Sequence, residues 1–251
     1  MAKKLSVCLT LVLLLAAAGT ASALTVAADS AKVTQLTGTA SVTRAAGGDL
    51  AILAEGDTLG PGDTVTLGRK SRMEIVLSDQ SVVRFDEKTQ FTLEALAFSP
   101  GETRNMKVHM ALGRLWAKVA RAAGISGGFS VSTKSMVSGV RGTVFRVNAN
   151  EDYSAVVKCY EGEVQVDGKK PENAASAAGP KPLSEPHSVS GPASVSGPKP
   201  VSMEEWTAII RAMQEVRVRA DGSVGKPFAF DPLADRDNWV RYNQERDTLA
   251  P

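Results

Sequence analysis

The sequence predicts an all-β protein, and two observations carry that prediction. From Lys32 to Val166, apolar and polar residues alternate in short segments, which places every second side chain on one face of a β-sheet. Between these segments, Gly, Asp, Asn and Ser residues mark turns, and runs with helical spacing are few. We therefore expect a single multi-stranded β domain over residues 24–167, arranged as a rolled sheet or a β-solenoid-like sandwich.

The first half of this domain contains four clear alternating segments. Each segment is short enough for a single strand and ends near a turn-forming residue. Their apolar residues are Ala40 and Val42; Met73, Ile75 and Leu77; Val83 and Phe85; and Phe91, Leu93 and Ala95.

The alternation changes phase at Gly113. Apolar residues have even numbers from Val108 to Leu112 and odd numbers from Leu115 to Val119. A bulge or a sharp bend at Gly113 explains this change, because an extra residue or a bend moves the following side chains to the other face. A helix over residues 106–120 is the alternative interpretation.

The second half of the domain continues with four more segments. Their apolar residues are Phe129 and Val131, Phe145 and Val147, Ala155 and Val157, and Val164 and Val166. Cys159 continues the face of Ala155 and Val157, so we expect it to be a small buried hydrophobic residue.

A linker follows over residues 168–202. This stretch contains seven prolines among many Ala, Ser and Gly residues. Proline blocks helices and central strands, which predicts a flexible spacer. The alternative is a segment that packs along the domain.

An amphipathic helix is expected over residues 203–216. Ser202 and Glu205 have the spacing of a capping box, and apolar residues recur at helical intervals at Met203, Trp206, Ile209, Ile210, Met213 and Val216. So short a helix needs a surface to cover, and we expect it to dock on the β domain rather than on a partner. The charged and aromatic tail over residues 217–251 is either a tethered arm or disordered.

The N-terminus predicts export. Lys3 and Lys4 precede an apolar stretch over residues 7–18, and Ala21-Ser22-Ala23 provides a small-residue cleavage site. These are the parts of a secretory signal peptide, residues 1–23, with cleavage expected after Ala23. The mature protein is expected in the periplasm, and no later segment has the length of a membrane span.

Charge and cysteine content exclude several classes of function. The chain has 29 basic and 27 acidic residues, and loss of Lys3 and Lys4 with the signal leaves 27 of each. A neutral mature protein gives no support for nucleic-acid binding, which requires a concentrated basic face. Cys159 is then the single remaining cysteine, so no internal disulfide is expected.

The sequence contains no set of residues typical of catalysis. A metal site would have to assemble His109, His187 and Cys159 from three distant places, and no spacing indicates a nucleophile beside a base. We therefore predict a non-enzymatic protein without a cofactor.

Two local features have a structural and a functional interpretation. Gly56-Asp57 and Gly62-Asp63 are expected to form turns before strands, with calcium coordination as the alternative. The basic residues Arg114, Lys118 and Arg121 are expected to form a solvated face. Trp116 lies among them and is a candidate for contact with a partner.

Four segments together resemble the FecR domain family. They are Gly-Asp-Thr-Leu-Gly-Pro-Gly-Asp-Thr-Val at 56–65, Met-Glu-Ile-Val-Leu-Ser-Asp-Gln-Ser-Val-Val-Arg-Phe at 73–85, Gly-Val-Arg-Gly-Thr-Val-Phe-Arg-Val at 139–147 and Tyr-Glu-Gly-Glu-Val-Gln-Val at 160–166. The most specific part is Val140-Arg141-Gly142-Thr143 with the later Glu161-Gly162 turn. Gly142 is expected to allow positive φ or close backbone contact.

The resemblance implies a periplasmic all-β domain found in regulators that relay iron-siderophore uptake to a sigma factor, and in stand-alone envelope proteins. The regulators carry a cytoplasmic segment and a membrane helix before the domain, whereas here a cleavable signal precedes it. We therefore expect a stand-alone module rather than direct control of a sigma factor.

The expected partner is another envelope protein, bound through an open sheet edge or the C-terminal helix. The alternative is peptidoglycan or another polysaccharide, stacked on Trp116, Trp239 or Tyr242. Candidate partner-binding residues are Arg141, Trp116 and Trp206. For Arg141 we favour a structural role, in which its guanidinium binds carbonyls of neighbouring turns, over recognition of a partner's carboxylate.

Overall fold

The computed structural model describes residues 26–48, 50–121, 126–169 and 207–249, and it confirms an all-β fold with one short helix. The expected signal peptide, Trp206 and all but the first two residues of the expected linker lie outside the described residues. In the described ranges, no helix combines the length and the apolar character that crossing a membrane requires.

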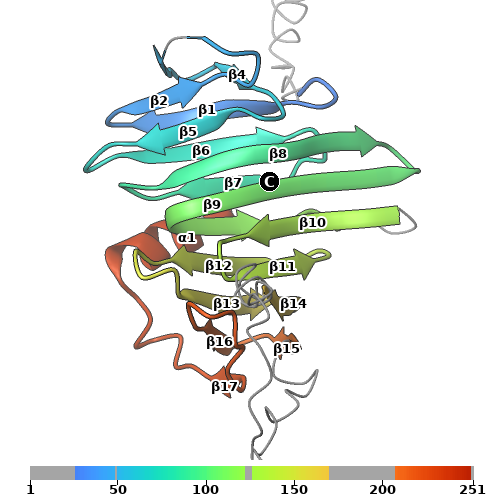
Figure 1. Ribbon diagram of the computed structural model, residues 1–251, viewed down its shortest axis with the longest axis vertical. Helices are drawn as coiled ribbons and strands as arrows, with labels where there is room; N and C mark the ends of the chain where they lie inside the picture. Colours follow the sequence, from blue (N-terminus) through green and yellow to red (C-terminus); the bar gives the residue numbers. More distant parts are fainter. Residues whose placement is uncertain (1–25, 49, 122–125, 170–206, 250–251) are drawn as a thin grey trace, which may run out of the picture.

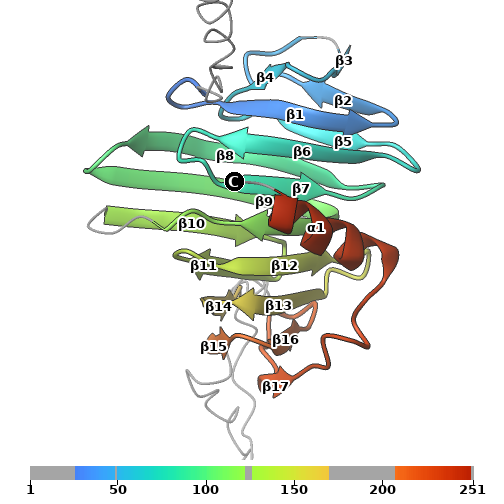
Figure 2. The same ribbon diagram turned by 180° about the vertical axis from the view of Figure 1, so that it is seen from behind.

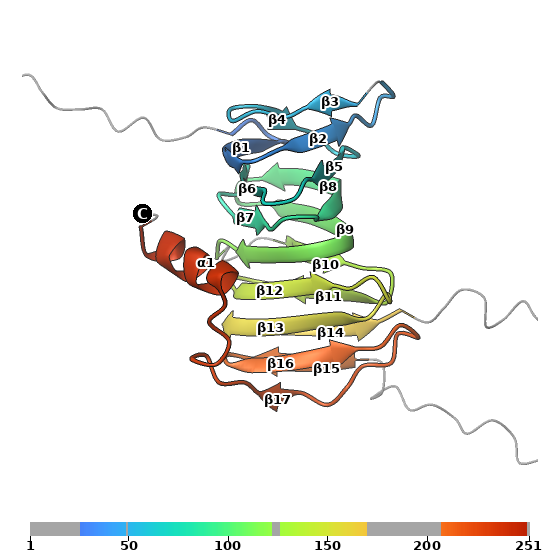
Figure 3. The same cartoon turned by 90° about the vertical axis from the view of Figure 1, so that its left-hand side faces the viewer.

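Within the described residues, seventeen strands form one continuous sheet that is folded into two layers. Layer A consists, in spatial order, of β4 (Thr58–Leu59), β1 (Ala31–Thr37), β6 (Arg72–Leu77), β7 (Val82–Phe85), the C-terminal part of β9 (Thr103–Lys118), β12 (Val144–Ala149), β13 (Ala155–Glu161), β16 (Gln214–Val218) and β17 (Phe228–Ala229). Layer B consists of β3 (Ala51–Ile52), β2 (Ala40–Thr43), β5 (Thr64–Leu67), β8 (Gln90–Ser99), the N-terminal part of β9, β10 (Ser126–Ser132), β11 (Met136–Val140), β14 (Glu163–Gly168) and β15 (Thr207–Arg211). The two layers rise side by side along the long axis of the molecule (Figures 1 and 3).

Strand β9 belongs to both layers and changes layer at Gly113. Up to Leu112 it pairs with β8, and its first seven residues also pair in parallel with β10. From Gly113 onward it pairs with β12 and then also with β7. Gly113 has a φ of 106°, so the expected bend is confirmed and the alternative of a helix over residues 106–120 is wrong.

The hydrophobic core lies between the two layers. Alternate residues of each strand point inward, as the period-two pattern predicts. The fully buried residues include Val33, Ile75, Val83, Phe145 and Val157 from layer A and Val65, Leu93, Val108, Val131 and Val164 from layer B.

The helix expected over residues 203–216 is wrong. Of that range, Thr207–Arg211 is strand β15 and Gln214 onward is strand β16, with a turn between them. Ile209, Ile210 and Val216 are β-branched and suit a strand as well as a helix. The outer edges of β13 and β14 provide the hydrogen-bonding partners that decide between the two.

The helix of this fold lies instead in the C-terminal tail, which is docked rather than disordered. Helix α1 (Asn238–Leu249) begins after Asp237, whose carboxylate accepts a hydrogen bond from the Val240 amide as an N-cap. Figure 2 shows α1 in front of layer A, across the middle of the stack. Trp239 and Val240 pack there with Trp116 and Tyr160 in a second apolar cluster.

Candidate functional site

Family-motif residues contribute to a polar hollow on the outer face of layer B. It has a volume of about 600 Å³ and is formed by β9, β10, β11 and β14. Lining residues include Asn105, Lys107, Gly128, Gly139, Arg141 and Gln165. We call it the layer B hollow.

Glycine creates this hollow. Gly128 lies opposite Asn105 in the β9–β10 pairing, and Gly139 lies opposite Gln165 in the β11–β14 pairing. Because the alternate residues of these strands fill the core, Gly128 and Gly139 occupy outward-facing positions without a side chain. A Cβ atom at Gly139 would have no other atom within 4 Å, so the surface there is open.

The hollow has two cationic residues on its rim, Lys107 and Arg141. Both side chains are exposed. Glu163 also lines the hollow, but it forms an ion pair of 3.3 Å with Arg211. Within the described residues, the Arg141 side chain has neither a hydrogen bond nor an ion pair.

The neighbours of Arg141 in the family motif have structural positions. Val140 is buried, and Gly142 has a φ of 62° in the turn between β11 and β12. The Thr143 hydroxyl donates a hydrogen bond to the Glu163 carbonyl at 3.1 Å. Glu161 is exposed, and Gly162 lies between β13 and β14 next to Thr143.

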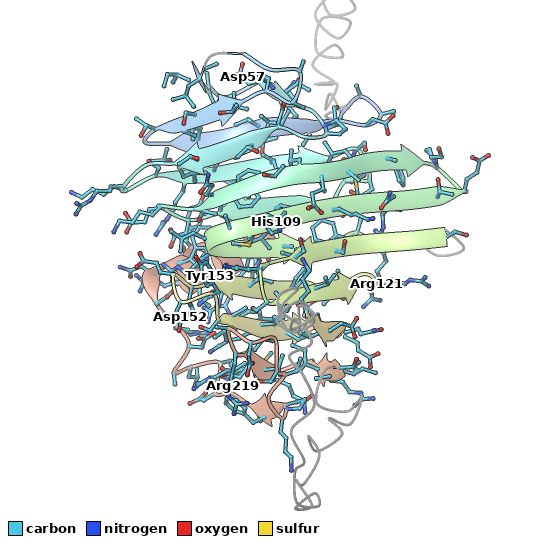
Figure 4. The ribbon with its side chains drawn as sticks, in the orientation of Figure 1. Asp57, His109, Arg121, Asp152, Tyr153 and Arg219 are labelled. Carbon is cyan, nitrogen blue, oxygen red and sulfur yellow. The ribbon has the colours of Figure 1, made fainter. Side chains whose placement is uncertain are left out.

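The Gly-Asp pairs lie in turns at one end of the stack. Asp57, labelled in Figure 4, accepts a hydrogen bond from the Ala54 amide. Asp63 is buried, and its carboxylate accepts hydrogen bonds from the amides of Ala45 and Gly60 and from Arg44. Gly56 and Gly62 precede these residues in the same turns.

Trp116 does not lie on an open surface. Its side chain is 1% exposed beneath α1, and its Nε1 donates a hydrogen bond to the Asp247 carboxylate at 2.9 Å. Arg114 and Lys118 also contact the tail, Arg114 through Asp237 and Lys118 through the Asp247 carbonyl. Arg114 and Lys118 therefore do not belong to the solvated face that we expected, whereas Arg121 is exposed.

Cys159 is buried, as the alternation predicts. Burial raises the pKa of its thiol to about 12, and the negative charges of Glu163 and Glu161 act in the same direction. Its thiol is therefore protonated at neutral pH and unsuited to nucleophilic chemistry. In the described part of the chain, no group of three or more His, Cys, Asp and Glu side chains could hold a metal ion.

Sequence reasoning missed Lys107, Asn105 and Gln165 as site residues. A signal was present, because Gly127-Gly128 and Gly139 interrupt segments of alternating apolar and polar residues. Glycine inside a strand often marks a place where another molecule or backbone comes close.

The family model of the FecR protein matches residues 63–165. No curated protein matches the chain. Two crystal structures of a candidate anti-sigma factor from Parabacteroides distasonis ATCC 8503 are similar at 19% sequence identity and a TM-score of 0.45, over 67% of this chain and 60% of that one. The family match runs from β5 into β14 and includes the layer B hollow and the Arg141 motif, and residues 63–165 of this chain therefore match a FecR domain.

Proposed function

We propose that this chain is a non-enzymatic, signalling-associated binding module of the bacterial cell envelope, and that it binds another envelope protein through the layer B hollow. The observation that carries the proposal is the exposed Arg141 on the rim of the hollow, which has no side-chain partner among the described residues and lies within the FecR match. Arginine is enriched among the residues that dominate protein interfaces. Its planar guanidinium also suits a bidentate bond to a carboxylate.

The chemistry of the hollow favours an extended polar segment with a carboxylate. Lys107 and Arg141 supply positive charge, while Asn105 and Gln165 offer amides that both donate and accept hydrogen bonds. The glycine floor lets a partner backbone approach the sheet closely. A polysaccharide ligand has less support, because Trp116 and Trp239 are each 1% exposed and cannot stack on sugar rings.

Arg141→Ala is expected to reduce partner capture at least about tenfold while the melting temperature stays unchanged, because Arg141 has no described intramolecular partner to lose. Capture is measured by crosslinking in intact cells, purification and mass spectrometry. Arg219→Ala is the matched control. Arg219 is also exposed, but it follows β16 in layer A and is not part of the layer B hollow (Figure 4). This variant should leave capture intact. A lowered melting temperature with normal capture would support a structural arginine and contradict the proposal.

The polysaccharide alternative has its own test. Sedimentation with purified cell-wall sacculi should leave the protein in the supernatant.

We also propose that the chain is exported to the periplasm through the signal peptide at residues 1–23. The supporting observations are the Lys3-Lys4 start and the Ala21-Ser22-Ala23 site. N-terminal sequencing of the protein from the envelope fraction should begin at Leu24 or within a residue or two of it. Recovery of an intact Met1 form from the cytoplasm would contradict both the compartment and the expected partner class.

A further inference from the structure

The C-terminal residues 228–249, which we call the strap, cover the outer face of layer A. The strap begins with β17, runs beside the stack and ends with α1, which lies against this face in Figures 2 and 3. Layer A is the opposite side of the molecule from the layer B hollow. The strap therefore leaves the proposed partner site open.

Beneath the strap, one row of side chains crosses layer A from strand to strand. Direct pairing partners follow one another in the order Glu74, Arg84, Trp116, Arg146, Lys158 and Glu215. Residues on either side of these positions, such as Ile75, Val83 and Val147, point into the core. The row therefore faces outward, and neighbouring side chains in it lie close enough to interact.

The strap places carboxylates opposite the cations of this row. Asp235 accepts from Arg146 at 3.0 Å, from Lys158 at 2.7 Å and from the Tyr160 hydroxyl at 2.5 Å. Asp247 accepts from Arg84 at 2.5 Å.

Two more ion pairs and one hydrogen bond connect the strap to layer A. Asp237 forms an ion pair of 2.6 Å with Arg114. Arg246 forms one of 3.0 Å with Glu74. The Tyr242 hydroxyl lies 2.7 Å from the Gln35 side chain at the far end of the row.

These charges depend on one another. The Arg146 side chain is 6% exposed, and within the described residues Asp235 is its single acidic partner. Burial acts to raise the pKa of Asp235, but the hydrogen bonds from Lys158 and Tyr160 and the charge of Arg146 outweigh it and lower that pKa. Without the strap, Arg146 would lose its described acidic partner, whereas Arg84 would keep Glu74 and Lys158 would keep Glu215 within the row. The face would then present an unpaired buried cation to an acidic segment that approaches.

The packing of the strap against layer A leaves buried polar atoms without hydrogen-bond partners. Six buried side-chain nitrogen or oxygen atoms lack a hydrogen-bond partner within the described residues, and three of them belong to α1: Trp239 Nε1, Asn243 Oδ1 and Arg246 Nε. A buried polar atom without a partner costs free energy that folding must offset. The strap therefore combines an apolar anchor, Trp239 and Val240, with ion pairs and unsatisfied polar atoms. The unsatisfied atoms lower the free energy needed to separate the strap from layer A.

We propose that the outer face of layer A is a second binding surface, selective for an acidic and aromatic segment, and that the strap occupies it in cis. A partner segment that carries carboxylates and an aromatic residue in the strap's arrangement binds there by displacing the strap. The strap is thus a reversible cover over this surface.

The test uses the full chain and a fluorescent synthetic peptide with the sequence of residues 228–249. In the double variant Asp235→Asn/Asp247→Asn, the backbone amides of α1 should exchange hydrogen at least about tenfold faster than in the unmodified chain. The double variant should also bind the peptide at least about tenfold more tightly than the unmodified chain does. Glu245→Gln is the matched control, because Glu245 is exposed and its carboxylate has no partner among the described residues. It should change neither measurement.

A milder variant protects the test against misfolding of the double variant. Asp237→Asn removes a partner from Arg114, which keeps its ion pair with Asp86, so no cation is left unpaired. The Asp237→Asn variant should bind the peptide a few-fold more tightly than the unmodified chain does. Faster exchange of α1 without tighter peptide binding, or unchanged exchange in both variants, would overturn the proposal. Arg141→Ala should leave peptide binding unchanged, which separates this surface from the layer B hollow.

Discussion

Arg104→Met is expected to lower the free energy of unfolding by about 3 to 5 kcal/mol, because it leaves a buried carboxylate without its cation. Arg104 and Asp79 form an ion pair of 3.2 Å in which the side chains are 2% and 1% exposed. Arg104 also donates to the Ala120 carbonyl, and Asp79 accepts from the amide and hydroxyl of Ser81. The pair thus ties β9 to the turn between β6 and β7.

Urea unfolding at neutral pH measures this effect by linear extrapolation. Arg219→Met is the matched control, since an exposed arginine without an acidic partner among the described residues should change stability by less than about 0.5 kcal/mol. Asp79→Asn/Arg104→Met contains no buried charge at this site and should be more stable than Arg104→Met alone. A loss below about 1 kcal/mol for Arg104→Met would show that water reaches Asp79 after the change.

Gly113→Val is expected to destabilise the fold by about 2 to 6 kcal/mol, the sum of backbone strain and overpacking. The φ of 106° at Gly113 is one that residues with a Cβ rarely adopt. A Cβ atom there would lie 2.5 Å from the Thr89 Cα, which is backbone and cannot rotate away. Because β9 changes layer at this residue, the strain falls on the connection between both layers.

Thermal unfolding followed by circular dichroism measures the loss. Gly139→Val provides the control, because it also adds a β-branched residue to a strand, but at a position with no atom within 4 Å and an ordinary φ. The control should melt close to the unmodified protein. Equal melting temperatures for Gly113→Val and Gly139→Val would show that the bend does not require glycine.

The strands and the bend were predictable because they depend on local pattern. Residues that face the core alternate along each strand, and the change from even to odd numbers at Gly113 recorded the passage of β9 from one layer to the other. The error over residues 203–216 has the same origin. Ile209, Ile210, Met213 and Val216 satisfy a helical period, and the choice of strand depends on open edges of β13 and β14 that a local pattern does not contain.

The candidate site and the strap contacts were less predictable, because they depend on register between distant segments. Gly128 and Arg141 line one hollow because β10 pairs with both β9 and β11. Asp235 is 89 residues from Arg146, and Asp247 is 163 residues from Arg84. The acids of the tail and the cations of the sheet are visible in the sequence as separate charges, but no spacing rule pairs them.

The edge strands at the two ends of the stack limit where another chain can add a strand to this sheet. In the described part of the chain, three of the four corners end in strands of two residues, β3, β4 and β17, which offer few backbone groups to another chain. The fourth corner is β15, with five residues and no described strand on its outer side. Among the described strands, β15 is therefore the longest edge strand available for edge-to-edge pairing, the common hazard of open β-sheets, and a second copy joined there would cover it.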